Sequence, residues 1–593
     1  MMKLKRRDWI AILVITAVYA ALALYNLGST KSPETLWEPA ASGESFYVDL
    51  GQSRALERVN IFGGVGTGKF KLEFSESPDV WSSPLDVSED VGNVFIWKSQ
   101  PLNVTARYVK LTVTSPGFTL NEMAFYEQGG DRVPLPIAGV TPDANAVPKR
   151  GTPANLFDEQ SIIPEYSSFM NSTYFDEIYH ARTAYEHLHG IVPYENTHPP
   201  LGKLLIAVGM ELFGVNPFGW RIIGTLFGIA MLPLIYVMAL RLFKKSKYAT
   251  LAAGLFALDF MHFTQTRIST IDVYGVFFIM LMFYFMQRYH TMNFYKQPLR
   301  KTLIPLFWSG LFFGIGVASK WIVLYGGAGL AIMLAIALFE RYREYQASGR
   351  LLAEGKIKDK ELLATCREAV NSFWKNTIIT LASCVAFFVI IPVIIYSLSF
   401  IPSLSATTEG FTLKGLIDSQ KNMYNYHSQL VASHPFASSW WQWPFMKRPV
   451  WFYSGSEGLP AGQVSSIVTM GNPLIWWTGI FAMLATLWIT LKRKDKSLFM
   501  IWIAFFSQYV PWMLVPRETF IYHYFAMVPF MILGIVYIMK LLEDKYAEAR
   551  YLRYAYVAVA FLLFIAFYPV LSGMQVSGDY VNHMLRWFPS WVF

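Results

Sequence analysis

Long apolar runs recur along this 593-residue chain and decide its class before any motif is considered. The first extends from Trp9 to about Leu27, and each run is near the roughly 20 residues that cross a bilayer as a helix. The chain is 54% hydrophobic and only 15% charged, which is more apolar than a soluble protein of this size requires for its core. The pattern predicts an α-helical polytopic membrane protein with about eleven spans. The other ten runs lie near 218–242, 249–265, 270–287, 303–318, 321–339, 375–399, 474–491, 497–515, 519–540 and 554–572.

Clusters of basic residues give the orientation of these spans. They follow alternate runs, at 241–247, 288–301, 340–374, 492–496 and 540–553. Cytoplasmic loops carry the excess of lysine and arginine, so a retained first span with its N-terminus inside puts every cluster on the cytoplasmic side. Orientation in a cell membrane then explains the formal net charge of +9, without nucleic acid as a partner. The run 201–214 is too short to cross, and we expect it to lie as a helix in the outer interface.

The first outer loop contains a segment of different character. Between residues 40 and 130, short alternating stretches are separated by Gly, Ser, Pro and Asp, a pattern typical of strands and turns, and the glycine-rich segment 63–69 is predicted to be one of the turns. The stretches lie at 44–50, 58–62, 69–74 and 106–114. They predict an inserted all-β sandwich. Their order resembles the discoidin or galactose-binding-like jelly roll, which leaves a carbohydrate ligand and a purely structural role both open.

These observations divide the chain into three parts. We expect a first span with its linker, an outer β insertion, and a membrane module with a large outer loop of its own. The boundaries are 1–39, 40–130 and 155–593, with the outer loop at 400–473.

An acidic pair, Asp176 and Glu177, lies in the first outer loop. A carboxylate at a membrane face can take a proton from a hydroxyl nucleophile, and a second acid beside it can orient the first. The alternative is that both acids only begin a predicted helix at 177–190, whose N-terminus favours negative charge. The residues alone leave both interpretations open. Other polar segments fall on the same non-cytoplasmic side, at 265–272, 318–321, 400–473 and 516–524.

Five segments follow one another in a recognisable order. They are Phe175-Asp-Glu177, His198-Pro-Pro-Leu-Gly-Lys203, Thr266 to Asp272, Ser319-Lys-Trp321, and the tryptophan-rich stretch from His434 to Tyr453 with Gly471-Asn-Pro-Leu-Ile-Trp-Trp477 after it. Together they resemble the protein O-mannosyltransferase family, which belongs to the lipid-phosphate-sugar-dependent membrane glycosyltransferases of GT-C fold. The resemblance runs from about residue 155 to the C-terminus.

The resemblance implies transfer of a sugar, most often mannose, from a polyprenyl-phosphate carrier to serine or threonine hydroxyls of a protein on the non-cytoplasmic face, with inversion. It carries the role of catalytic base to Asp176, with Glu177 as its neighbour. Because the leaving group is an activated phosphate, such an enzyme needs a base and positive charge more than it needs an acid. The carrier-linked sugar is the expected donor. No other cofactor and no metal-ligand set follow from the chain, since Glu186, His187 and His189 do not make one.

Three cations at outer corners are the candidates for the donor phosphate: Arg267, Lys320 and Arg517. The fork of Arg267 suits a phosphate, although this side chain can instead snorkel to the interface or pair with Asp272. Lys320 can hold the phosphate as a point charge or anchor the interface beside Trp321.

Polar and aromatic residues of the same outer segments are expected to form the substrate pocket. His198 either frames the donor pocket or is a polar residue of a turn, and the tryptophans either stack on sugar or acceptor peptide or belong to the membrane interface. The predicted residues are His198, Lys203, Asp272, His434, Trp440, Trp441 and Trp443.

The chain also departs from the family pattern. Residues 400–473 are too few for the repeated β-trefoil insertion that eukaryotic members carry there, and the compact form resembles bacterial members of the plasma membrane. A eukaryotic protein of this kind would reside in the endoplasmic reticulum membrane. Other functions stay open: glycosyl transfer to a lipid or a cell-wall polymer, transport, and sugar binding by a receptor. Transport is disfavoured because neither an internal repeat nor a group of mid-membrane charges is present in the sequence.

Overall fold

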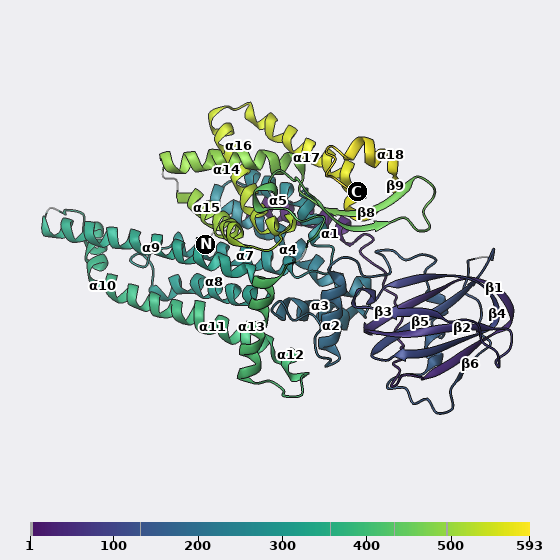
Figure 1. Cartoon of the computed structure of the whole chain (residues 1–593). Coiled ribbons are helices and arrows are strands. Elements are labelled where there is room, and N and C mark those ends of the chain that lie inside the picture. Colours follow the sequence, from purple (N-terminus) through teal and green to yellow (C-terminus); the bar gives the residue numbers. More distant parts are fainter. Residues whose placement is uncertain (1–3, 131, 356, 432, 494–495) are drawn as a thin grey trace.

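The computed structural model describes residues 4–130, 132–355, 357–431, 433–493 and 496–593 (Figure 1). Within this described part, eight helical segments are long and apolar enough to cross a membrane, which confirms the polytopic helical class. They are α1 (Arg6–Leu24), α4 (Pro217–Phe243), α8 (Leu299–Ser319), α9 (Ile322–Ala353), the stretch Lys360–Ser405, α14 (Pro473–Arg493), α16 (Val528–Lys545) with the turn before it, and α17 (Ala549–Ser572).

The three other predicted spans take different forms. The run at 249–265 divides into α5 (Ser246–Ala257) and α6 (Phe260–Gln265), because Asp259 accepts a hydrogen bond from the main-chain N–H of His262 (3.1 Å) and so begins a new helix. The run at 497–515 is α15 (Lys496–Tyr509), followed by a 3-10 turn. The run at 270–287 is α7 (Asp272–His290), which is largely buried among α4, α8 and α9.

The stretch Lys360–Ser405 consists of α10 (Lys360–Val385), α11 (Ile391–Ser399) and α12 (Ile401–Ser405). One π-helical turn at 386–390 joins the first two, directly before Pro392. Because proline has no N–H to donate, a widened turn of this kind accommodates the missing hydrogen bond.

The shorter helices lie outside the spans. The predicted helices at 177–190 and 201–214 are present as α2 (Glu177–Leu188) and α3 (Leu201–Phe213). A further helix, α13 (Leu413–Gln429), follows α12, and α18 (Gly578–Tyr580) lies close to the C-terminus.

The outer segment forms one antiparallel sheet of six strands in the order β3-β2-β4-β1-β5, with β6 also paired to β1. Register shifts between Asp49 and Arg54 divide β1, so the predicted strands 44–50 and 58–62 are its two halves. The glycine-rich segment 63–69 differs from the predicted turn, because it lies within the end of β1 and the start of β2 and only Thr67 separates the two strands. The buried core of the sheet also includes Trp37 and Leu156. The strands are β1 (Ser45–Gly66), β2 (Gly68–Ser75), β3 (Leu85–Glu89), β4 (Trp97–Ser115), β5 (Phe118–Glu127) and β6 (Gly139–Pro142); a second, small sheet contains β7 (Val450–Gly455), β8 (Gln463–Thr469) and β9 (Val576–Ser577).

The Val94–Phe95 loop of the large sheet packs against α4 and hydrogen-bonds to the segment that precedes α2. Phe95 has a positive φ of 56°, and its ring stacks on Trp220 of α4 with 5.9 Å between ring centroids. The main-chain N–H of Thr173 donates to the carbonyl oxygen of Phe95 (3.0 Å), and its hydroxyl donates to the carbonyl oxygen of Val94 (2.7 Å). The strands therefore hold the chain directly before Asp176.

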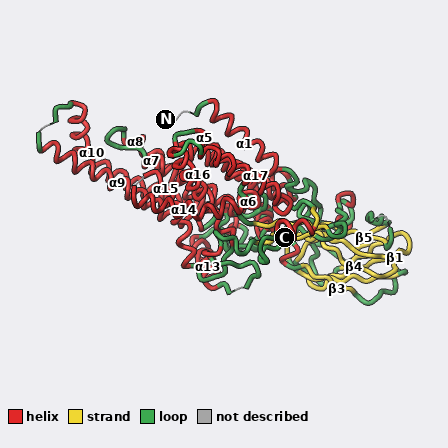
Figure 2. Tube along the Cα trace, turned by 90° about the horizontal axis from the view of Figure 1, so that it is seen from above, coloured by secondary structure: helices red, strands yellow, loops and turns green. Residues whose placement is uncertain are grey.

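The two ends of the helical region differ. Figure 1 shows the strands beyond one end of the helices, whereas the connection between α9 and α10 lies at the opposite end. Figure 2 shows the same separation after a turn of 90°. The basic segment 340–374 is thus remote from the β sheet, as expected if the two lie on opposite sides of a membrane.

Candidate active site

A cavity of about 600 Å³ lies where several helix ends meet. Its wall combines the start of α2, the start of α7, the corner between α8 and α9, one face of α13 and the segment after α15. Five of the predicted site residues line it: Asp176, His198, Asp272, Lys320 and Arg517. Segments far apart in the sequence thus bring carboxylates, an imidazole and two cations together.

Asp176 immediately precedes α2 and is held there by an unusual backbone. Phe175 has a φ of 50°, in the left-handed region that costs a non-glycine residue on the order of 1–3 kcal/mol. Its ring packs against Phe452 and Tyr522, with centroids 4.4 and 6.2 Å away. This packing stabilises the sharp bend that directs Asp176 into the cavity, where its carboxylate has no hydrogen bond to any described residue.

The surroundings of Asp176 make it a stronger base than an ordinary aspartate. Burial raises the pKa of its carboxyl to about 7, and the negative charges of Asp272 and Glu195 act in the same direction while Lys320 opposes them. A general base is most effective when its pKa lies near the working pH. The geometry therefore provides an unpaired carboxylate suited to accept a proton at neutral pH.

The two cations of the cavity differ in their partners. Lys320 is mostly buried, and its Nζ lies 2.6 Å from Oδ1 of Asp272. The guanidinium of Arg517 is half-buried at the cavity wall and has neither a hydrogen bond nor an ion pair within the described ranges. Arg517 is therefore free to bind an anion, whereas Lys320 contributes positive charge that Asp272 partly neutralises.

Glu177 corrects the prediction that both acids serve the site. It is fully buried, and its carboxylate accepts hydrogen bonds from Nε and Nη2 of Arg221, each at 2.7 Å, and from the main-chain N–H of Ser269 at 3.0 Å. Arg221 also donates to the carbonyl oxygens of Leu27, Phe169 and Ser172. Glu177 therefore joins α2 to α4 and lies outside the cavity wall.

Glu177→Gln is expected to lower the free energy of unfolding by about 3–5 kcal/mol, because it leaves the buried Arg221 without its counter-charge. Thermal and denaturant unfolding in detergent measure the effect. Glu165→Gln is the matched control, since it breaks an exposed pair with Arg132 (2.9 Å) and should change stability little. Equal unfolding midpoints for both variants would contradict the structural role of Glu177.

Arg267 likewise does not line the cavity, contrary to its predicted place at the donor phosphate. It is 6% exposed, and it donates to the carbonyl oxygens of Ala23, Tyr25 and Asn26 at 3.1, 2.8 and 2.9 Å. These carbonyls lie at the end of α1, where a helix has unpaired acceptors and partial negative charge. Arg267 thus caps α1, and with these contacts made its guanidinium is not free for a phosphate.

Lys203 lies behind the cavity rather than in it. It is 1% exposed, and its Nζ binds the carboxylate and the carbonyl oxygen of Glu195. It lines a smaller neighbouring cavity of about 120 Å³, of which His198 forms the shared wall.

The predicted aromatic group near residue 440 also stands outside the cavity lining. Trp443 is fully buried and stacks on His523, a lining residue, with centroids 5.9 Å apart. Trp440 packs on Tyr509, and Trp441 is 49% exposed. His434 is exposed, with its main-chain N–H bound to Glu518. These residues support or flank the wall instead of contacting the cavity.

Three histidines of the lining, His180, His427 and His523, were not identified from the sequence. Burial lowers the pKa of His180 well below its ordinary value and that of His427 to about 4, so both rings are neutral at pH 7. His427 belongs to α13, and its Nε2 lies 2.8 Å from the carbonyl oxygen of Thr197. Its place three residues after Tyr424 on an amphipathic helix was a signal that could have indicated an inward face.

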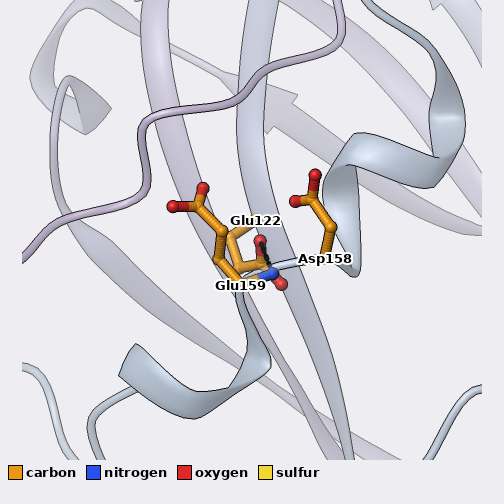
Figure 3. A group of neighbouring side chains, drawn as sticks. All are labelled: Glu122, Asp158 and Glu159. Carbon is orange, nitrogen blue, oxygen red and sulfur yellow. Dashed lines mark hydrogen bonds between the residues drawn. The ribbon is translucent and has the colours of Figure 1, made fainter.

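A group of three carboxylates lies on the β sheet, apart from this cavity (Figure 3). One oxygen each of Glu122, Asp158 and Glu159 lie within 4.8 Å of one another, and burial raises the pKa of Glu122 to about 8. Each acid already has a donor: Gln160 for Glu122 (2.5 Å), and Thr35 for Asp158 (2.8 Å) and for Glu159 (3.1 Å). The group fastens the linker before α2 to β5.

Comparisons with known proteins agree with this geometry. A family profile described as dolichyl-phosphate-mannose-protein mannosyltransferase matches residues 197–348, and one described as the C-terminal four transmembrane-helix region of protein O-mannosyltransferase matches residues 412–591. The β sheet lies before both matched ranges.

Individual relatives extend the match. The polyprenol-phosphate-mannose protein mannosyltransferase of Mycolicibacterium smegmatis is 24% identical over 476 residues, which cover 70% of this chain and 87% of the relative. The protein of the same name from Corynebacterium glutamicum is 26% identical over 448 residues, covering 66% and 81%. The Saccharomyces cerevisiae Pmt1-Pmt2 complex with bound sugar donor shares the fold, with a TM-score of 0.57 at 13% identity over 71% of this chain and 89% of that chain. The chain belongs to the protein O-mannosyltransferase family and has its GT-C membrane fold.

Proposed function

We propose that this protein transfers mannose from a polyprenyl-phosphate carrier to serine or threonine hydroxyls of a protein substrate on the non-cytoplasmic face of the membrane. One observation supports it above all: an unpaired carboxylate with a raised pKa and an unpaired guanidinium line the same cavity, as this reaction requires. The names of the relatives supply the donor and the class of acceptor.

The roles of the cavity residues follow from the chemistry. Asp176 accepts the proton of the acceptor hydroxyl while its oxygen attacks the anomeric carbon of the mannose. The bond from that carbon to the phosphate oxygen breaks, and the carrier phosphate leaves with the electron pair. Arg517 and Lys320 stabilise the phosphate as its charge grows. Attack from the face opposite to the leaving phosphate inverts the configuration.

Sidedness and domain division belong to the same proposal. The cavity is lined by the start of α2, the start of α7 and the corner between α8 and α9. Figure 1 shows α2 on the side of the helices that faces the β sheet, whereas the ends of α9 and α10 that follow one another in the chain lie at the opposite end. By the positive-inside rule, this arrangement supports a location of the cavity and the β sheet outside the cytoplasm. We retain 1–39, 40–130 and 155–593 as the proposed division, with a carbohydrate ligand for the β segment as an open alternative to a structural role.

A transfer assay tests the proposal. Membranes that contain the protein are incubated with radiolabelled polyprenyl-phosphate mannose and a peptide rich in serine and threonine. We expect label on the peptide that is released by β-elimination, the reaction diagnostic of a glycosylated hydroxyl. If the label appears only in lipid or in cell-wall polymer, the acceptor is that molecule and not a protein. If peptide, lipid and polymer all remain unlabelled, the result favours the transporter or receptor alternatives.

The rate of transfer is expected to fall as pH drops below about 7, because protonation of Asp176 removes the base. Asp272→Asn should move this acidic limb to lower pH. The substitution removes a negative charge that raises the pKa of Asp176 and frees Lys320, which lowers it, so both effects have the same sign. A profile of kcat/KM between about pH 5 and 9 measures the limb. An unmoved limb, or one displaced to higher pH, would contradict the assignment.

A further inference from the structure

We propose that Glu195 is the positioning residue of the cavity: it fixes the ring of His198 so that the lone pair of Nε2 faces the cavity and accepts a hydrogen bond from a substrate hydroxyl. The substrate side of this inference rests on the proposed function. The fixed ring can be tested without any transfer reaction.

Glu195 occupies the turn before α3 and is 8% exposed. Its Oε1 accepts a hydrogen bond from the main-chain N–H of Thr197 (2.9 Å) and lies 3.0 Å from Nδ1 of His198. Its Oε2 pairs with the ammonium of Lys203, which also donates to the carbonyl oxygen of Glu195 itself (2.8 Å). Two cavities meet at this group, since His198 lines both and Glu195 lines the smaller one.

The charge state of Glu195 follows from these contacts. Burial acts to raise its pKa, but Lys203 and His198 hold the pKa well below the ordinary range of a glutamate. An ionised carboxylate has no proton to donate and can only accept. The hydrogen in the contact between Glu195 and His198 must therefore be carried by Nδ1 of the imidazole.

The hydrogen on Nδ1 determines the protonation state of Nε2 of His198. Burial lowers the pKa of His198, so its ring is neutral at pH 7, and a neutral ring with its hydrogen on Nδ1 has a lone pair on Nε2. The rings of His180 and His427 both lie edge-to-face with that of His198, with centroids 6.1 and 5.1 Å away. Glu195 also holds Thr197, whose carbonyl oxygen contacts His427, so the neighbouring ring is positioned through the same turn.

A fixed acceptor has a clear use in this cavity. Lys320 and Arg517 can only donate, and Asp176 is reserved for the proton of the attacking hydroxyl. A sugar or a serine side chain presents hydroxyls that need an acceptor when they leave water. The ligand chemistry is therefore a hydroxyl group, and its two sources are the hexose of the donor and the side chain of the acceptor.

Chemical modification of the purified full chain tests the orientation. Diethyl pyrocarbonate reacts with the lone pair of a neutral imidazole, and peptide mass spectrometry gives the rate at each histidine. In Glu195→Gln, the rate at His198 should fall about threefold to tenfold, because the carboxylate no longer raises the basicity of Nε2 or fixes the tautomer. The rate at the exposed His434 should stay the same.

Glu186→Gln is the matched control. It breaks a buried pair with Arg182 (2.7 Å) on nearby α2 and makes no contact with His198, so it should leave the rate at His198 unchanged. The double variant Glu195→Gln/Lys203→Met removes both charges of the pair and should repeat the loss at His198 if the single variant folds poorly. An unchanged rate at His198 in both Glu195 variants, or an equal fall in Glu186→Gln, would overturn the proposal.

Kinetics then identify the hydroxyl. A Glu195→Gln variant with a raised KM for the lipid-linked donor places the hydroxyl on the sugar, and one with a raised KM for the peptide places it on the acceptor. Unchanged values for both would refute the substrate contact. A wild-type protein that fails to transfer mannose but shows the Glu195-dependent rate at His198 would overturn the proposed function and retain the positioning role.

Discussion

Replacing Asp176 with asparagine is expected to lower the turnover of mannose transfer by about 10²- to 10⁴-fold, the range that a general base contributes. The amide keeps the size of the side chain but cannot accept the hydroxyl proton. Donor affinity should change by less than about threefold, because the proposed phosphate contacts are made by Arg517 and Lys320 and not by Asp176. Single-turnover rates with labelled donor measure the chemical step, and retention of labelled donor on the purified variant measures binding.

Asp86→Asn is the control for this substitution. Asp86 is an exposed aspartate of β3, distant in the fold from the cavity lining, and the same change there should leave turnover intact. Equal turnover for wild type and Asp176→Asn would remove the assigned base. A loss confined to donor binding would make Asp176 a binding residue instead.

Replacing Arg517 with alanine is expected to lower kcat/KM for the donor by about 10²- to 10³-fold, since the variant loses the unpaired cation of the cavity wall that we propose binds the phosphate. Part of the loss should appear in a higher KM for the donor, because the phosphate is charged in the ground state as well as in the transition state. Arg517→Lys should recover part of the rate, as it keeps the charge without the two-pronged geometry.

Lys414→Ala serves as the matched control for Arg517. Lys414 is an exposed cation of α13 that does not line the cavity, so its removal changes the charge of the same face without changing the site. An Arg517→Ala variant with wild-type KM and kcat for the donor would exclude the phosphate contact. Steady-state rates over a range of donor concentrations distinguish these outcomes.

The sequence predicted those features of the fold that depend on the residue pattern within a single segment. Length and hydropathy predict the helical membrane class, since a bilayer demands runs of a certain length. They cannot show that Asp259 begins a second helix inside one run, because this depends on which way a single side chain turns. Alternation likewise indicates strands at 44–50 and 58–62, but it cannot show that both belong to one bent strand.

The site was predictable in part for a related reason. Asp176, Asp272 and Lys320 could be placed together because each falls in a segment that the alternation of spans and basic clusters predicts on the non-cytoplasmic side. The sequence could not show which of the two adjacent acids faces the cavity. Glu177 forms an ion pair with Arg221 of α4, and the spacing of these residues in the sequence does not indicate that pairing. Arg267 was misplaced because its partners are main-chain carbonyls of α1, which leave no signal in the sequence.

The docking of the Val94–Phe95 loop has a mechanical consequence. Hydrogen bonds and ring contacts from the strands fix the residues that precede Asp176. The β segment therefore helps to position Asp176 and is not structurally independent of the helices. Deletion of the β segment would expose the indole of Trp220 and remove the hydrogen bonds that hold Thr173, three residues before Asp176. Exchange with another β domain would preserve activity only if the new domain made the same contacts with Thr173 and Trp220.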